Sequence, residues 1–127
     1  MEIVVTIKGT IPGTPIPKGR PRFSKSGHAY TPARTKGYEQ TVKWLLLSEM
    51  QKQPIETLPK GTDVYLELLF RLTKRHRADL DNLIKSFSDA ANGVLYEDDR
   101  QVMHIAASIR IVPSGKDEGT DYRVEKA

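Results

Sequence analysis

The stretch that decides the fold is residues 77–102, RADLDNLIKSFSDAANGVLYEDDRQV. Asp79 or Asp81 stands where the N-cap of a helix is expected, and Asn92-Gly93 supplies a stop signal. Between these signals apolar residues recur at the spacing of one helix face. This stripe consists of Leu80, Leu83, Ile84, Phe87, Ala91 and Val94. The stretch therefore predicts one amphipathic helix with acidic residues before and after it.

Two alternating apolar patterns flank this helix and predict strands. In residues 64–72 and again in residues 103–111, apolar side chains occupy every second position. Leu69 lies on the opposite face of the first strand, which predicts a central strand covered partly on both sides. A cluster of positive charge follows this strand at residues 74–77, at the end where ligands usually bind in open α/β sheets.

The remaining elements complete a small mixed domain. We expect a strand over residues 3–8 that ends at Gly9, a helix over residues 35–51, and a last strand over residues 120–124 that pairs as a hairpin. For Trp44, off the helix stripe, packing at the core edge is the default, with a partner chain or nucleic acid as alternatives. The prediction is a single α/β (α+β) domain over residues 1–127, with the order β-α-β-α-β-β. Its four-stranded mixed sheet and two helices would bury all of these apolar faces.

Composition excludes several classes of site and of protein. The 127 residues suit one domain and include no cysteine, which rules out disulfides, thiolate metal sites and cysteine nucleophiles. No apolar run approaches the roughly 20 residues that span a bilayer, and the N-terminal residues do not resemble a signal peptide. We expect a cytoplasmic protein. The HExxH and GxxxxGK[ST] motifs of zinc hydrolases and P-loop proteins are also missing.

Charge is distributed very unevenly along the chain. Lys and Arg outnumber Asp and Glu by 20 to 16, a net charge of +4, yet residues 78–99 hold six acids and one base. A basic surface attracts a polyanion, whereas clustered carboxylates supply the hard oxygen ligands that Mg²⁺ or Mn²⁺ prefers. The alternative is that these acids are ordinary solvated residues. Their pattern favours the metal site.

The first 36 residues carry seven bases against one acid, and residues 10–32 are rich in proline and glycine. This segment predicts a substrate-contacting arm, in which cations meet phosphates and the rings of Phe23 and Tyr30 can stack on bases. A small hairpin is expected over residues 22–30. A flexible, solvated basic loop is the alternative. The predicted DNA-binding residues here and after the strand at 64–72 are Lys18, Arg20, Arg22, Lys25, Arg34, Lys74, Arg75, His76 and Arg77.

The acidic stretch has the parts of a phosphodiester-cleaving metal site. Asp79 and Asp81 enter the helix together, and Asp98 or Asp99 returns as a third carboxylate. Carboxylates from two segments, completed by water, can hold Mg²⁺ against a phosphate. Lys85 has two interpretations. It forms a surface pair with Asp81, or it stabilises charge that develops on the reacting phosphate, and we favour the second.

These residues resemble a known family. The DLDNLIK and DDRQV segments at residues 79–85 and 98–102 match the D-x-D-N-x-x-K and D-D-x-Q-[VI] segments of the RusA Holliday junction resolvases. The upstream GRPR and YTP segments at residues 19–22 and 30–32 resemble the branch found in phages and Gram-positive bacteria.

The resemblance implies a homodimeric, Mg²⁺-dependent endonuclease that makes paired nicks in four-way DNA junctions, in recombination and repair. It implies metal-binding roles for Asp79, Asp81 and Asp99, a catalytic role for Lys85 and an accessory role for Asp98. A homodimer also suits the two-fold symmetry of a junction. Two alternatives stay open: a non-catalytic nucleic-acid-binding module, and a phosphohydrolase acting on small nucleotides.

Overall fold

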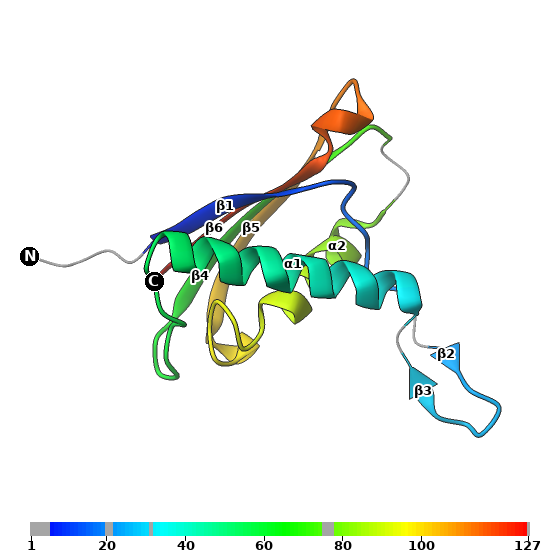
Figure 1. Ribbon diagram of the computed structural model, residues 1–127, viewed down its shortest axis with the longest axis horizontal. Helices are drawn as coiled ribbons and strands as arrows, with labels where there is room; N and C mark the ends of the chain where they lie inside the picture. The colour runs from blue at the N-terminus through cyan, green and yellow to red at the C-terminus, as the bar shows by residue number, and fades with distance from the viewer. Residues whose placement is uncertain (1–5, 20–21, 31, 75–77, 127) are drawn as a thin grey trace, which may run out of the picture.

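The computed structural model describes residues 6–19, 22–30, 32–74 and 78–126. A four-stranded sheet carries two helices on one face, and a two-stranded hairpin projects beside the N-terminal start of the first helix (Figure 1). The elements are β1 (Thr6–Pro12), β2 (Arg22–Phe23), β3 (Ala29–Tyr30), α1 (Ala33–Lys52), β4 (Val64–Leu72), α2 (Leu80–Ala91), η2 (Asp99–Gln101), β5 (Val102–Ile111), η3 (Gly115–Asp117) and β6 (Gly119–Lys126). The predicted fold class and order are confirmed, and the small hairpin expected over residues 22–30 is formed by β2 and β3.

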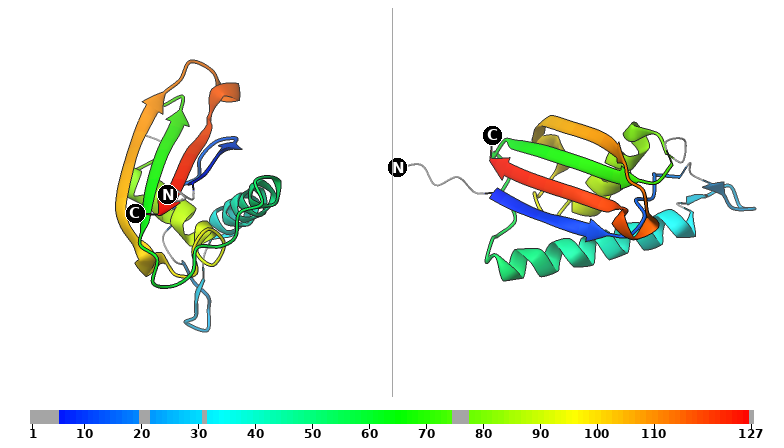
Figure 2. Two further views of the ribbon diagram at one scale, coloured as in Figure 1. Left: turned by 90° about the vertical axis from the view of Figure 1, so that its left-hand side faces the viewer. Right: turned by 90° about the horizontal axis from the view of Figure 1, so that it is seen from above.

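The strand order in the sheet is β1-β6-β4-β5. β6 pairs antiparallel with both β1 and β4, whereas β5 pairs parallel with β4 across the α2 connection. The hairpin expected between the last two strands was therefore wrong, because β4 lies between β5 and β6 in the sheet. β4 is therefore a central strand, as its sequence predicted, and β1 and β5 form the two edges of the sheet (Figure 2). In β4 the residues at even positions, from Val64 to Leu72, are all buried.

Helix α1 contributes the buried residues Val42, Leu46 and Met50, and helix α2 contributes Leu83 and Phe87. Both helices pack on the face of the sheet to which the buried β4 side chains point. Gly93, with φ of +79°, ends the α2 segment after the C-cap Asn92, as the sequence predicted. Val94 was expected in the helix stripe, but it is buried in the turn that follows the helix.

Gly9 does not end the first strand, contrary to expectation. β1 continues through it to Pro12, so that Ile7 and Ile11 are both buried, and residues 3–5 of the predicted strand lie outside the described residues. A Cβ atom at Gly9 would lie 2.5 Å from the hydroxyl oxygen of Tyr122. Glycine is needed there because a ring from another strand occupies the space of a side chain.

Two expectations about exposure were also wrong. Trp44 does not pack at the core edge, because it lies on the outer face of α1 with 76% of its surface exposed. The sheet does not bury every apolar face either, since Met103, Ile105 and Ile111 of β5 remain about half exposed or more. Sequence periodicity places side chains on one face but does not reveal what covers that face.

Candidate active site and DNA-binding surface

Asp79 and Asp81 lie at the start of α2. Asp79 occupies the N-cap position with extended backbone angles, but its side chain forms no capping hydrogen bond. Asp81 lies in the first turn, and both residues are exposed. Neither carboxylate forms a hydrogen bond or an ion pair with another described residue. Their oxygen atoms are therefore available to a ligand, and the helix N-terminus beside them favours negative charge.

Lys85 lies one helical turn beyond Asp81 and is exposed. No ion pair joins it to Asp81, so the surface pair that was the alternative interpretation is not formed. Its ammonium group is on the same side of α2 as Asp81, because residues four apart share a helix face.

The second acidic segment has a well-defined structure. The Asp98 carboxylate accepts a hydrogen bond from the backbone N–H of Arg100 at 2.9 Å, while the Gln101 side chain accepts one from the Asp98 N–H. This reciprocal capping box begins η2. The Arg100 hydrogen bond is the main cause that lowers the pKa of Asp98 below its usual value. Asp98 thus stays ionised, but one of its oxygen atoms is occupied by the turn.

Gln101 fixes this turn to the rest of the domain. Its side-chain amide nitrogen donates to the carbonyl oxygens of Leu58, Pro59 and Thr62, at 3.3, 2.8 and 3.0 Å. The Asp99 N–H donates to the side-chain oxygen of Asn92, the residue that ends α2. The exposed Asp99 is therefore held beside the C-terminal end of α2, where its carboxylate interacts with that of Asp98.

The two acidic segments lie at opposite ends of α2. Asp79 and Asn92 are 13 residues apart, and at about 1.5 Å of rise per residue the ends of the helix lie about 20 Å apart. Among the described residues, no three His, Asp or Glu side chains lie close enough to hold one metal ion. A single chain thus brings Asp79 close to Asp81, and Asp98 close to Asp99, but does not bring the two pairs together.

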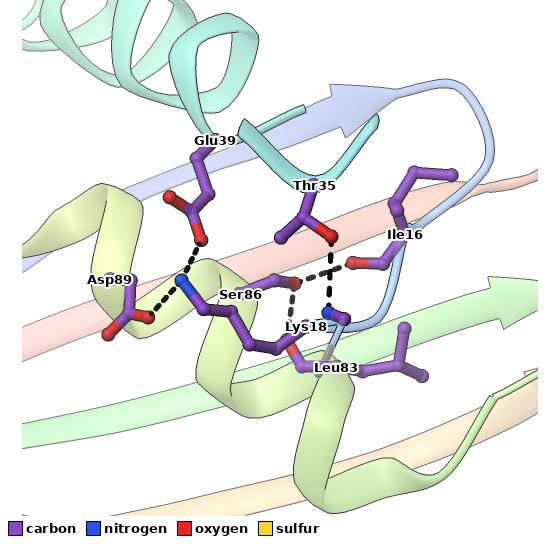
Figure 3. A network of polar contacts seen from close by, with 8 residues as sticks. Ile16, Lys18, Thr35, Glu39, Leu83, Ser86 and Asp89 are labelled. Atoms are coloured by element: carbon purple, nitrogen blue, oxygen red, sulfur yellow. Dashed lines mark hydrogen bonds and ion pairs between the residues drawn. The ribbon is translucent and has the colours of Figure 1, made fainter. Parts of the chain in front are cut away.

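Lys18 is part of a polar network that anchors the basic segment (Figure 3). Its ammonium group lies 2.7 Å from the Glu39 carboxylate on α1 and 2.9 Å from that of Asp89 on α2. Partial burial lowers its pKa, but these hydrogen bonds and opposite charges outweigh that effect, and the pKa is raised overall. Lys18 therefore links the two helices, and contact with DNA would require its ammonium to share these carboxylates.

Backbone contacts complete the anchor. The Ser86 hydroxyl donates to the Ile16 carbonyl at 2.7 Å, and the Gly19 N–H donates to the Thr35 hydroxyl at 3.1 Å (Figure 3). The Lys18 N–H also donates to the Asn82 carbonyl at 2.8 Å. The segment that leads to the hairpin is thus bound to both helices. The alternative of a flexible loop does not describe residues 16–19.

The hairpin β2–β3 presents aromatic and basic side chains to solvent. Phe23 and Tyr30 are 71% and 49% exposed, and Arg22 and Lys25 are exposed as well. A hollow of about 350 Å³ lies at the base of the hairpin, and Arg22 and Arg34 both line it. Two guanidinium groups around one hollow provide a suitable place for a phosphate group.

The other predicted DNA contacts divide into two groups. Lys74 is exposed two residues after the end of β4. Arg20, Arg75, His76 and Arg77 lie outside the described residues.

Comparison with known proteins identifies the family. Residues 12–125 match the protein family described as "Endodeoxyribonuclease RusA". The chain belongs to the RusA family. A curated relative from Bacillus subtilis (strain 168), the "Uncharacterized protein YqaN", is 32% identical over 122 residues, which covers 80% of this chain and 85% of the relative.

Membership of the RusA family confirms the resemblance on which the sequence interpretation depends, and it places the chain among endodeoxyribonucleases. The matched region includes both acidic segments, the hairpin and the Lys18 anchor. Neither helix in the described part of the chain is long and apolar enough to cross a lipid bilayer.

Sequence reasoning missed the residues that position the site. Gln101 was seen only as part of a family motif, although an S/T/D-x-x-Q/E pattern at Asp98 is a signal for the capping box. The partners of Lys18 gave no such signal, because Glu39 and Asp89 are 21 and 71 residues away in the sequence.

Proposed function

We propose that this protein is a Mg²⁺-dependent, structure-selective endodeoxyribonuclease that resolves four-way DNA junctions by paired symmetric nicks. The observation that carries the proposal is the RusA family match over residues 12–125. The exposed carboxylates of Asp79, Asp81 and Asp99, which fall on the family motif, support it. We further propose a role in DNA recombination and repair in the cytoplasm of a bacterium, from a bacterial or prophage gene.

The donor set suits a hard divalent cation, either Mg²⁺ or Mn²⁺, because it consists of carboxylate oxygens. Such an ion, when bound, polarises a phosphoryl oxygen and lowers the pKa of bound water. However, the described residues of one chain do not assemble three ligands. The two carboxylate pairs fit a shared ion only if a second chain contributes one of them, which agrees with a homodimer.

We assign different roles to the individual residues. Asp79, Asp81 and Asp99 would bind the metal, since the carboxylates of Asp79 and Asp81 are exposed at the start of α2 and the exposed carboxylate of Asp99 lies beside that of Asp98. Lys85 would stabilise negative charge that develops during cleavage, because its ammonium group is exposed and forms no ion pair with Asp81. Asp98 would be an accessory acid, since one of its oxygens already accepts the Arg100 N–H.

The hairpin would act as the DNA-contacting arm. Its base is bound to α1 and α2, so little conformational entropy would be lost when the hairpin docks. Arg22, Lys25 and Arg34 would bind phosphate groups, and Phe23 and Tyr30 would stack on unpaired bases near the branch point.

A synthetic four-way junction tests the proposal. Wild-type protein should nick it in the presence of Mg²⁺ and lose the activity with EDTA, whereas a linear duplex of the same sequence should be cut much more slowly.

Asp81→Asn should reduce cleavage by at least about 100-fold while junction binding persists, because removing a carboxylate removes a ligand but also removes repulsion from DNA. Lys85→Ala should likewise lose turnover with little change in affinity. Failure of wild-type protein to cut any branched DNA with Mg²⁺ or Mn²⁺ would refute the proposal.

One observation favours a second candidate, a non-catalytic DNA-binding module. A monomer would lack a three-carboxylate site among its described residues, yet it would keep the basic hairpin. This candidate predicts junction binding without cleavage under every metal condition. A small-nucleotide phosphohydrolase would instead show binding that hardly weakens with rising salt, because only a polyanion contact releases many counterions.

A further inference from the structure

A buried carboxylate just before β6 joins two segments that are far apart in the sequence. Glu118 is only 6% exposed, and both of its carboxylate oxygens accept hydrogen bonds. Oε1 accepts the Thr14 hydroxyl at 2.8 Å, and Oε2 accepts the N–H and the hydroxyl of Thr73 at 2.9 and 3.1 Å. The Gly13 N–H also donates to the Glu118 carbonyl at 3.2 Å. Glu118 thus holds the chain that follows β1 against the chain that follows β4.

The turn that carries this carboxylate is fixed to the sheet. The Arg71 side chain on β4 donates to the Asp117 carbonyl at 2.7 Å. A Cβ atom at Gly119 would lie 2.7 Å from a guanidinium nitrogen of Arg71 and 2.8 Å from the Ile11 carbonyl oxygen, so only glycine fits directly after Glu118. Glu118 is therefore a fixed point of the fold and not a mobile surface acid.

One of the two segments, residues 13–19, is called the strap below, and it ends on α2. The hydroxyl of Ser86, a residue that is 1% exposed, donates to the Ile16 carbonyl at 2.7 Å (Figure 3). The Lys18 N–H donates to the Asn82 carbonyl at 2.8 Å. The strap therefore connects the buried carboxylate before β6 with the first turns of α2.

The other segment leads to the predicted metal ligands. Thr73 begins the chain between β4 and α2, and this chain enters the helix at Asp79 and Asp81. The strap reaches the same turn, because Asn82 directly follows Asp81. The first turn of α2 is thus connected to Glu118 by two routes, through its own chain and through the strap. Since the strap continues toward the hairpin, the same contacts relate the hairpin to the carboxylates.

We propose that Glu118 is a positioning residue of the nuclease, which holds the hairpin and the carboxylates of α2 in one fixed arrangement through the strap. DNA bound by the hairpin would then present its phosphate at a set distance from Asp79 and Asp81. Glu118 is buried and acts through Thr14 and Thr73. Misplacement of a reacting group by about 1 Å can reduce a rate by about 100-fold, so loss of this link should lower turnover more than affinity. The catalytic part of the proposal rests on the proposed nuclease function.

Glu118→Gln tests the positioning role. Glutamine keeps the length of the side chain but replaces one accepting oxygen with an NH₂ donor, so it cannot accept from Thr14 and Thr73 on separate oxygens. We expect kcat for junction cleavage to fall about 10- to 100-fold, while KM changes by less than about three-fold. Circular dichroism identifies a temperature at which the variant is fully folded, and the assay is run there.

Asp121→Asn is the matched control on the same strand. It also removes one negative charge, and the Asp121 carboxylate likewise accepts hydrogen bonds from two other strands, from Thr10 at 2.8 Å and from Arg71 at 3.2 Å. Neither of these printed partners belongs to the strap or to the chain between β4 and α2. The control should keep kcat within about two-fold of wild type, whatever its melting temperature. An equal fall in kcat in both variants would overturn the role of Glu118.

Thr14→Val tests the strap side of the link with a milder change. Valine has nearly the shape of threonine but lacks the hydroxyl that donates to Glu118. We expect kcat to fall about 3- to 10-fold, and the double variant with Glu118→Gln to be no slower than Glu118→Gln alone, because both changes break one link. Losses that multiply in the double variant would show that the two residues act separately.

Amide hydrogen exchange tests the strap without DNA. In Glu118→Gln and in Thr14→Val, the Lys18 N–H should exchange at least about ten-fold faster, because the strap has lost its fixed end. The Gln101 N–H, which donates to the Asp98 carbonyl in the turn before β5, should exchange as in wild type.

The outcomes keep the claims apart. Faster exchange at Lys18 together with a lower kcat would support the positioning role. Faster exchange with an unchanged kcat would overturn that role, and unchanged exchange at Lys18 would overturn the strap. If the wild-type protein cuts no branched DNA, the proposed nuclease and the positioning role both fail, and exchange at Lys18 still decides whether the strap exists.

Discussion

The two edges of the sheet are completed in different ways. At the β1 edge Ile7 and Ile11 are buried, Pro12 lacks an N–H group, and the Gln53 side chain at the end of α1 donates to the Lys8 carbonyl at 2.9 Å. At the β5 edge no described residue pairs with the outer side of the strand, and Met103, Ile105 and Ile111 remain exposed. The chain protects one edge with its own residues, whereas the described residues leave the other edge open.

The largest expected effect is on association. A homodimer that joins through the open β5 edge would be weakened by Ile105→Asp by more than about 100-fold, because the new carboxylate would be an unpaired charge between two strands, at a cost of about 3 to 5 kcal/mol. Sedimentation equilibrium measures this change. Trp44→Asp is the matched control, since it adds the same charge at an exposed apolar residue of α1 and should leave the dimer intact. An equal effect of both substitutions would contradict the difference between the edges.

A pair of isoleucine truncations compares the edges within the folded protein. Ile7→Ala on β1 should lower the free energy of unfolding by about 2 to 5 kcal/mol at every protein concentration, because the side chain is fully buried in one chain. Ile105→Ala on β5 should lower the melting temperature mainly at concentrations where the dimer forms. Thermal unfolding at several concentrations checks both. A loss at Ile105 that does not depend on concentration would indicate burial within one chain.

Gly9→Ala tests how closely β1 is packed. The new Cβ would meet the Tyr122 hydroxyl at 2.5 Å, so we expect a loss of about 1 to 3 kcal/mol in unfolding free energy, measured by urea denaturation. Tyr122→Phe in the same chain should recover part of the loss by removing the hydroxyl. Gly37→Ala, where nothing lies within 4 Å of the new Cβ, is the control and should not destabilise the protein.

The smallest expected effect concerns the turn before β5. Because the pKa of Asp98 is lowered in the folded state, its ionised form stabilises the fold at pH values above the unfolded value of 3.8. This contribution is lost as the pH falls through the lower folded value. Asp98→Asn should be slightly less stable than wild type at pH 6, and the difference should shrink at pH 3. Urea unfolding at both pH values measures it, and a difference that grows on acidification would reverse the assigned sign.

Much of the fold could be predicted because its signals are local. The alternation in residues 64–72 and the Asn92-Gly93 stop are patterns within one element, and the structure confirms both. The acidic segments that carry the family motif are equally local. Their sequence order gave the expectation that the two carboxylate pairs converge.

The other features of the structure depend on contacts between residues that are far apart in the sequence. The need for Gly9 comes from Tyr122, and the engagement of Lys18 comes from Glu39 and Asp89, which no local pattern indicates. Periodicity assigned Ile105 to the helix-covered face correctly but could not show that the helices stop short of it. The length of α2 was visible in the sequence. We did not infer from it that the helix keeps the two carboxylate pairs apart within one chain.

Amide hydrogen exchange at the two edges tests the central claim most directly. Exchange rates of the individual amides in β1 and β5 of the wild-type protein would be measured at a low and at a high protein concentration. We predict that protection of the outward-facing amides of β5 rises with concentration while protection in β1 stays constant. Protection in β5 that is the same at both concentrations, with the protein shown to be dimeric at the higher one, would contradict a role of this edge in the proposed homodimer.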